Sequence, residues 1–331
     1  MASLYPESLR LEASSRCQLA CPACPTASGA IQPTIGSGVL KLADFQALVD
    51  SSPWVKKIEL SNYGEIFLNP DLLEILAYAY AKGIQLSAHN GANLNHVKSE
   101  VLEGLVKYQL HSITCSIDGA SQATYEQYRV KGDFERVIGN IQKINHFKAL
   151  YQSSYPILDW QFVVFGHNQH EIPAARQMAT DLGMNFRLKL SWDGDFSPVV
   201  DRDGLRQEVG VADREEYREK HGRDYMQTIC HQLWDKPQIN WDGKVLGCCR
   251  NFWGEFGGNA FRDGLAMAIN SERMTYARQM LGGQQPPRDD IPCTTCSIYQ
   301  TCRRRASGWK GPLSPVNTLD SINGYAMPCA G

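Results

Sequence analysis

The sequence predicts an α/β fold, a partial (β/α)6 barrel of the TIM-like type followed by a small C-terminal α+β domain. Short apolar runs of strand length alternate about six times with segments of helical apolar spacing, which is typical of a parallel sheet with helical crossovers. No glycine-rich phosphate-binding fingerprint accompanies them, and this favours a partial barrel over a dinucleotide-binding sheet. Beyond residue 230 the runs become short and rich in cysteine, which indicates a separate domain.

Each barrel element has its own local signal. The expected strands are 9–13, 55–60, 84–88, 111–117, 159–165 and 185–190. The expected helices are 41–51, 70–81, 95–105, one from 121, 133–150 and 171–182. Pro70 suits the start of its helix because the N–H it lacks would be unpaired there anyway. Active sites of parallel barrels lie at the carboxyl ends of the strands, so we expect functional residues in the loops after them.

The alternation stops between residues 192 and 224, where Asp, Arg and Glu are frequent and apolar spacing is weak. We therefore expect a barrel over 1–195, a linker over 196–229 and a cysteine-rich domain over 230–331. A polar helix is expected within the linker, near 212–220. In the last part, alternating runs on both sides of Asp242-Gly243 predict a hairpin, and a helix is expected near 274–281.

Composition excludes several classes of protein. The net charge of −2 over 331 residues gives no electrostatic reason to expect nucleic acid or an anionic membrane as a partner. No apolar run reaches the roughly 18 residues of a membrane span, and the first residues lack the regions of a signal peptide. Eleven cysteines without an export signal indicate a reducing, cytoplasmic compartment and metal ligation rather than disulfides.

Three cysteines with the spacing CxxxCxxC come after the first expected strand: Cys17, Cys21 and Cys24. Three thiolates can hold three irons of a four-iron cluster, and the fourth iron is then open to a small molecule that carries an amine and a carboxylate. The alternatives are a zinc site completed by a histidine, or buried thiols. Zinc loops usually present cysteines in CxxC pairs, so the spacing favours the iron-sulfur interpretation.

The chain resembles the radical S-adenosylmethionine (SAM) superfamily, and within it the branch with a C-terminal SPASM or twitch domain for auxiliary iron-sulfur clusters. Cys17, Cys21 and Cys24 match the motif that binds the SAM-ligating [4Fe–4S] cluster. Ala23 stands where many members have an aromatic residue that contacts adenine. The resemblance implies an oxidoreductase that cleaves SAM reductively to a 5′-deoxyadenosyl radical, which abstracts hydrogen from the substrate.

Further matches lie after the second and third expected strands. Tyr63-Gly64-Glu65 resembles the Gly-Gly-Glu motif that receives the SAM amino group, with Tyr63 in place of the first glycine. Asn90 and the glycine after it resemble the Thr-Asn-Gly of the family. The resemblance therefore implies that these residues bind SAM.

The later strands carry the remaining SAM matches. Ser116 and Asp118 belong to a segment that resembles the one contacting the ribose and methionine of SAM. Arg129 is similar to an arginine that faces the SAM carboxylate, and Val164 with Asn168 resembles the region near the adenine. Taken singly, each has an ordinary structural explanation, such as a turn or a solvated charge. Their order after the cysteine loop is what favours SAM binding.

The C-terminal part resembles the SPASM signature but has Ala306 where a further cysteine is expected. Its cysteines are Cys230, Cys248, Cys249, Cys293, Cys296, Cys302 and Cys329. These seven are one fewer than two fully ligated clusters need. One possibility is a twitch-like single cluster on Cys230, Cys248, Cys293 and Cys296. The other is a complete cluster on Cys293, Cys296, Cys302 and Cys329, with an incompletely ligated one on Cys230 and Cys248. Structural zinc is the alternative to both.

Two residues are candidates for contact with the substrate. Cys249 comes directly after the hairpin cysteine, where some members of the branch have a proton acceptor, so the resemblance implies a catalytic role; a further ligand or a buried filler is the alternative. Asp193 lies just past the last barrel strand and is either a substrate contact or a solvated turn residue, as is Asp195. His89 and His167 lie near strand ends but have no partner spacing that singles them out.

The branch mostly modifies ribosomally made peptides, by crosslinking, epimerisation or splicease-type backbone excision. The resemblance therefore implies a precursor peptide as substrate and an electron donor such as flavodoxin or ferredoxin. The first strand begins near residue 8, so we expect any leader-binding function to come from a separate small partner protein, as in spliceases. A dehydrogenase or epimerase of a small molecule such as an aminocyclitol, and an iron-sulfur electron-transfer protein, are the alternative functions.

Overall fold

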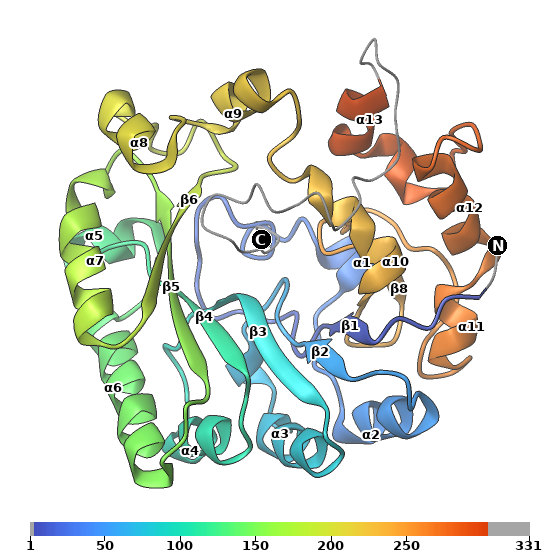
Figure 1. Cartoon of the computed structure of the whole chain (residues 1–331), viewed down its shortest axis with the longest axis horizontal. Helices are drawn as coiled ribbons and strands as arrows, with labels where there is room; N and C mark the ends of the chain where they lie inside the picture. Colours follow the sequence, from blue (N-terminus) through green and yellow to red (C-terminus); the bar gives the residue numbers. More distant parts are fainter. Residues whose placement is uncertain (1–2, 304–331) are drawn as a thin grey trace.

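The computed structural model describes residues 3–303, which form one eight-stranded sheet with helices around it (Figure 1). The strand order is β6-β5-β4-β3-β2-β1-β7-β8. All pairs from β6 to β7 are parallel, and only β8 is antiparallel to its neighbour. Because β6 stands at one end of this order, the first six strands form an open arc, and the predicted partial barrel is confirmed.

The barrel strands are β1 Ser8–Leu11, β2 Lys57–Glu59, β3 Gln85–Ala92, β4 Ser112–Ser116, β5 Ile157–Val164 and β6 Asn185–Leu190. The helices between them are α1 Gln32–Ile35, α2 Leu42–Ser51, α3 Leu72–Ala81, α4 Ser99–Lys107, α5 Gln122–Tyr128, α6 Phe134–Tyr151 and α7 Ile172–Asp181. The longer helices α2, α3, α4, α6 and α7 lie on the outside of the curved sheet (Figure 1). Ser121 and Asp133 cap α5 and α6 by accepting backbone N–H bonds, so these two helices begin where the sequence predicted.

The C-terminal third adds α8 Arg202–Val209, α9 Arg214–His221, α10 Gln232–Asp235, β7 Gln238–Ile239, β8 Val245–Gly247, α11 Leu265–Ile269, α12 Glu272–Leu281 and α13 Ser297–Arg303. Single 3-10 turns lie at Ile66–Leu68, Gln169–Glu171, Gln227–His231 and Pro292–Thr295. The predicted hairpin is present, with Gly243 at φ 88° in its turn. The polar linker contains α8 as well as the predicted helix, because Asp201 caps α8 through the N–H of Gly204.

Two predicted boundaries near the third strand are wrong. The strand β3 runs to Ala92 rather than stopping at 88, and α4 begins at Ser99 rather than at 95. The intervening residues are held by side chains, since Asn93 Oδ1 accepts the N–H of Asn95 and Asn95 Nδ2 donates to the carbonyl of Asn93. Such local bonds compete with helix formation.

The sheet continues from the barrel into the cysteine-rich part. The strand β7 pairs with β1, and the buried Arg10 side chain reinforces this pairing by donating to Gln238 Oε1 at 3.0 Å and to the carbonyl of Ser61 at 3.0 Å. The predicted division into 1–195, 196–229 and 230–331 stays a prediction, because the sheet spans the second boundary.

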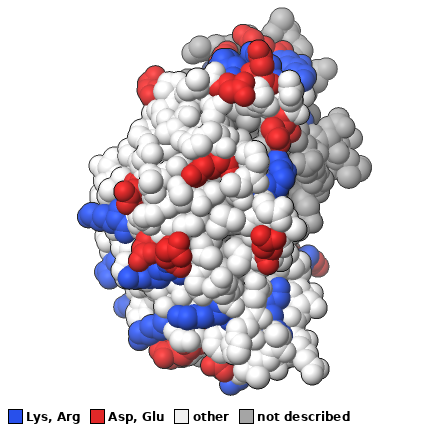
Figure 2. Space-filling model, turned by 90° about the vertical axis from the view of Figure 1, so that its left-hand side faces the viewer, with Lys and Arg blue, Asp and Glu red and all other residues white. Residues whose placement is uncertain are grey.

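No helix within residues 3–303 is long and apolar enough to cross a bilayer. On the face shown in Figure 2, basic and acidic side chains are interspersed without a large area of one sign.

Candidate functional site

A cavity of about 90 Å³ lies at the carboxyl ends of the barrel strands and is lined by Cys17, Cys21 and Cys24. The same cavity is lined by six of the predicted SAM-binding residues: Tyr63, Gly64, Glu65, Asn90, Ser116 and Arg129. These residues come from four different loops and strands, so they meet only in the folded chain. The arrangement agrees with the general position of active sites in parallel barrels.

The cysteine loop is held by apolar packing and by polar contacts to two of the thiols. Leu19 and Cys21 belong to a small buried cluster. Arg129 Nη1 lies 3.9 Å from Cys21 Sγ, and Asn93 Nδ2 lies 3.7 Å from Cys17 Sγ. Burial raises the pKa of the Cys17 thiol to about 12, so a bound cation is needed to hold it as a thiolate. Iron supplies that charge, and these residues fit an iron-sulfur cluster.

Glu65 offers a buried carboxylate to the cavity. Its oxygens accept the N–H of Asn93 at 2.6 Å and that of Phe67 at 3.2 Å. Desolvation raises the pKa of Glu65 to about 7, although its backbone hydrogen bonds and the charge of Arg129 act in the opposite direction. Among the described residues, Glu65 has no cation in direct ion-pair contact. The ammonium group of an amino acid would supply one, which is what the resemblance implies for SAM.

The backbone of Tyr63 and Gly64 is positioned by a residue that the sequence analysis missed, Glu12. The Glu12 carboxylate accepts the N–H of Tyr63 at 3.1 Å and that of Gly64 at 3.2 Å. A Cβ on Gly64 would lie 2.2 Å from the carbonyl oxygen of Ser14, so only glycine fits there. An acidic residue at the end of a buried strand was the signal that could have identified Glu12.

Three of the residues predicted to bind SAM do not line the cavity, and two of them form hydrogen bonds with residues that do. Asp118 forms a 2.6 Å ion pair with Arg129 and accepts the N–H of Val163 at 2.7 Å. Asn168 Nδ2 donates to the carbonyls of Asp118 and Val163, so it shapes this loop. Val164 packs into the main core, and its neighbour Val163 lines the cavity instead.

The cavity also contains polar and aromatic residues that the sequence analysis did not identify: Asn62, Gln161, Lys189, Trp192 and Arg214. Lys189 lies in the predicted last strand, where its spacing could have marked it as facing inward. Arg214 comes from α9 in the linker, and nothing local indicates that this helix reaches the barrel. Asn62 follows β2, and the other four make the side of the cavity formed by β5, β6 and α9.

A second, smaller cavity is lined by Cys230, Cys248, Cys293 and Cys296. Burial raises the pKa of the Cys248 thiol to about 11, and apolar side chains including Phe256 and Leu281 complete the walls. These four cysteines are the set proposed for a twitch-like single cluster, and they fit it. Cys329 and the side chain of Cys302 lie outside the described residues, so the second ligand arrangement stays a prediction.

Among the side chains that the structure describes, which leave out that of Cys302, no three of His, Cys, Asp or Glu are grouped closely enough to bind a single metal ion. A four-iron cluster is larger than one ion and keeps its thiolates farther apart. Structural zinc stays the alternative at the cysteine-lined cavities.

Residues 230–297 match the family model of the SPASM iron-sulfur cluster-binding domain. The fold is similar to that of Streptococcus suis SuiB bound to S-adenosylmethionine, with a TM-score of 0.63 and 15% identity over 90% of this chain and 72% of that chain. The chain contains a SPASM iron-sulfur cluster-binding domain and has the fold of SuiB. The structure of SuiB bound to precursor peptide SuiA gives a TM-score of 0.62 at 13% identity, over 90% and 71% of the two chains.

BtrN in complex with AdoMet and 2-DOIA has a TM-score of 0.51 and 14% identity, over 94% of this chain and 98% of that chain. No curated protein sequence matches the chain. The family match thus supports the predicted iron-sulfur cluster-binding SPASM domain, and the solved structures support the predicted partial-barrel fold.

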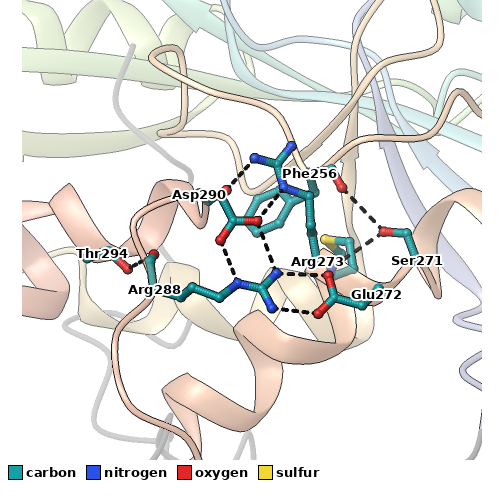
Figure 3. Close-up of polar contacts among 8 residues, drawn as sticks. Phe256, Ser271, Glu272, Arg273, Arg288, Asp290 and Thr294 are labelled. Carbon is teal, nitrogen blue, oxygen red and sulfur yellow. Dashed lines mark hydrogen bonds and ion pairs between the residues drawn. The ribbon is translucent and has the colours of Figure 1, made fainter.

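In the SPASM domain, an ion-pair network holds the loop that carries Cys293 and Cys296 (Figure 3). Arg288 donates to both carboxylate oxygens of Glu272 in α12, at 2.6 and 2.8 Å, and to Asp290. Arg273 also contacts Asp290, and the hydroxyl of Thr294 donates to the carbonyl of Arg288 at 2.8 Å. The network thus ties the loop to α12 on one side of the cysteine-lined cavity.

The two predicted substrate-contacting residues lie outside the main cavity. Cys249 is disulfide-bonded, and its carbonyl accepts a bond from Asn62 Nδ2 at 3.1 Å. Its role as a proton acceptor requires a reduced thiol and stays a prediction. Asp193 Oδ1 accepts the N–H groups of Asp195 and Phe196, as a turn residue does. A contact from Asp193 to substrate also stays a prediction.

The two histidines considered in the sequence are bonded to serines. His89 Nε2 lies 3.0 Å from Ser112 Oγ, and His167 Nδ1 lies 2.8 Å from Ser197 Oγ. Neither histidine lines the cavity that contains Cys17, Cys21 and Cys24.

Proposed function

We propose that the chain is a radical SAM enzyme that abstracts a hydrogen atom from a residue of a ribosomally made precursor peptide. One observation carries the proposal: Cys17, Cys21 and Cys24 share a single cavity with the carboxylate of Glu65 and the guanidinium of Arg129. Three cysteines are an incomplete ligand set for a four-iron cluster, and the two charged groups match the ammonium and carboxylate of an amino acid that completes it.

When bound, the [4Fe–4S] cluster and SAM supply one-electron cleavage to a 5′-deoxyadenosyl radical. The residues of this chain hold the reactants. Glu65 accepts the ammonium group, and its bonds from the backbone of Asn93 and Phe67 fix the direction of the carboxylate. Arg129 is oriented by the ion pair with Asp118, which leaves the rest of its guanidinium for the SAM carboxylate.

The four cysteines of the SPASM domain indicate how the substrate radical reacts after hydrogen abstraction. Cys230, Cys248, Cys293 and Cys296 are a full set of ligands for one auxiliary cluster, so no iron is left for a substrate atom. We infer that these four cysteines would hold a cluster that supplies an electron acceptor for the substrate radical and no binding site for the substrate. The outcome is then an oxidation, such as a crosslink.

The similarity to SuiB bound to precursor peptide SuiA supports a peptide substrate. A flavodoxin or ferredoxin would reduce the cluster, and a small leader-binding protein would deliver the peptide. The alternative is oxidation or epimerisation of a small molecule such as an aminocyclitol. The similarity to BtrN, which extends over 98% of that chain, favours this second candidate.

The two candidates are separated by supplying substrates to the anaerobically reconstituted protein with SAM and dithionite. The probes are the peptides encoded by neighbouring genes and a set of aminocyclitols. We expect a mass change in a peptide, with one 5′-deoxyadenosine per modified molecule. Turnover of an aminocyclitol with unchanged peptides would instead establish the second candidate and overturn the first.

A further inference from the structure

Two cations, the buried Lys189 and the half-buried Arg214, line the cavity of Cys17, Cys21 and Cys24 without an ion pair to any carboxylate in residues 3–303. Lys189, in β6, is 7% exposed, and its Nζ donates to Gln161 Oε1 at 3.0 Å. Arg214, at the start of α9, donates from Nε and Nη2 to the carbonyl of Leu190 at 3.2 and 2.9 Å. Its guanidinium also lies 4.7 Å from the centroid of the Tyr225 ring. Both cations therefore bond only neutral groups.

Burying a cation is unfavourable unless an anion compensates it. Desolvation, with repulsion from Arg214, lowers the pKa of Lys189 to about 7, and desolvation lowers the pKa of Arg214 to about 10. Asp118 acts on Lys189, but it is already paired with Arg129 at 2.6 Å. Asp224 acts on Arg214 without an ion pair between the two among the described residues, and its Oδ1 accepts the N–H of Met226. The cavity thus lacks one anion near β6 and α9.

The proposed cofactors do not supply it. An oxidised four-iron cluster with three thiolates is a net anion. SAM is a net cation whose charge has the same magnitude, so the charges of the two compensate each other. Glu65 is occupied by the SAM ammonium group in the proposed arrangement. The missing anion must then come with the substrate, and this step rests on the proposed function.

We propose that Lys189 and Arg214 form a subsite for a carboxylate of the substrate. Gln161 holds the Lys189 ammonium in place, and the backbone carbonyl of Leu190 holds the guanidinium of Arg214. Trp192 lines the same cavity and is 40% exposed, so it offers an apolar wall to the carbon chain that bears the carboxylate. The substrate class is accordingly a peptide with an acidic side chain near the modified residue, or with its own C-terminal carboxylate in the site.

The test measures binding of small carboxylates to the reconstituted protein with SAM, by calorimetry. N-acetylglutamate α-methylamide represents an acidic side chain, N-acetylalanine represents a C-terminus, and N-acetylglutamine α-methylamide is the neutral control. We expect at least one acid to bind about tenfold more tightly than the neutral amide, as a charge-assisted contact should. The acid that does so identifies which carboxylate the site takes.

The variants Lys189→Met and Arg214→Met should each remove this preference, and Lys189→Arg should retain it. Lys107→Met, at the end of α4, is the matched control and should leave the preference unchanged. Equal binding of acids and amide by the unmodified protein would overturn the subsite. So would an unchanged preference in Lys189→Met that is accompanied by weaker SAM binding, since Lys189 would then serve SAM.

Formation of 5′-deoxyadenosine from SAM and dithionite is measured on the same samples. Its absence would contradict the proposed function, whereas the acid preference is judged from the binding data alone. The two failures are therefore distinguishable.

Discussion

Glu12 shows how a single buried side chain sets the geometry of the loop of Tyr63 and Gly64, which we propose binds SAM. Its carboxylate is fully buried and accepts the N–H groups of Tyr63 and Gly64. Desolvation nevertheless raises the pKa of Glu12 from 4.5 to about 8. The folded protein therefore binds a proton at Glu12 between pH 4.5 and 8 that the unfolded chain releases.

This proton determines the sign of the change in stability with pH. The free energy of unfolding should fall as the pH rises from about 5 to about 8, and Glu12→Gln, which cannot ionise, should lack this component. We expect the stability of the variant relative to the unmodified protein to increase by roughly 2–4 kcal/mol between these two pH values. Urea unfolding monitored by circular dichroism measures it, with the exposed Glu74→Gln as control. Parallel pH profiles for Glu12→Gln and the unmodified protein would contradict this role.

At the scale of elements, the sequence predicted which helices and strands exist better than where they end. The helix α6 was predicted because its apolar spacing is long and Asp133 caps it locally. The start of α4 was wrong because side chains of Asn93 and Asn95 bond the backbone of the preceding loop. The linker helix α9 was expected, but its contact with the cavity through Arg214 depends on tertiary packing that no local pattern encodes.

The loop that carries Cys293 and Cys296 gives an element-scale prediction. Arg288 joins Glu272 to Asp290, and removal of its guanidinium should loosen this loop at the auxiliary site (Figure 3). In Arg288→Met we expect a several-fold faster loss of about half of the cluster iron to a chelator, with the other half released at the rate of the unmodified protein. Release is measured by the absorbance of the iron complex. Arg136→Met, which removes an exposed pair with Asp133 on α6, is the control.

The experiment is specific because the iron held at Cys17, Cys21 and Cys24 is expected to be released at an unchanged rate. A uniform acceleration of iron loss would mean that Arg288 supports the whole fold. No acceleration would mean that the network does not hold the cysteine loop.

At the scale of the whole molecule, one sheet carries both cysteine-lined cavities. Pairing of β1 with β7 places the hairpin beside the proposed SAM-binding loop, and Asn62 Nδ2 donates to the carbonyl of Cys249 across the two parts. The cysteine motifs were readable in the sequence because cluster ligands need close spacing. Which of the seven C-terminal cysteines are ligands could not be read from the sequence, because it depends on how residues far apart in the chain fold around one cavity.

Iron content tests the ligand set that the fold favours. The reconstituted protein should contain about eight irons, in two clusters, and Cys230→Ala should lower this toward about four. Deoxyadenosine formation from SAM alone should persist, because the variant leaves the first cavity intact. A full iron content in Cys230→Ala would contradict the twitch-like set and favour ligation by Cys293, Cys296, Cys302 and Cys329.

The most direct test of the central claim is anaerobic incubation of the reconstituted protein with SAM and dithionite, with 5′-deoxyadenosine and methionine measured by mass spectrometry. The protein is expected to form both products in equal amounts. The variant with Cys17, Cys21 and Cys24 changed to alanine is expected to form neither, while it keeps the iron of the auxiliary cluster. Failure of the iron-loaded protein to form 5′-deoxyadenosine, or undiminished formation by the triple variant, would contradict radical SAM chemistry at this site.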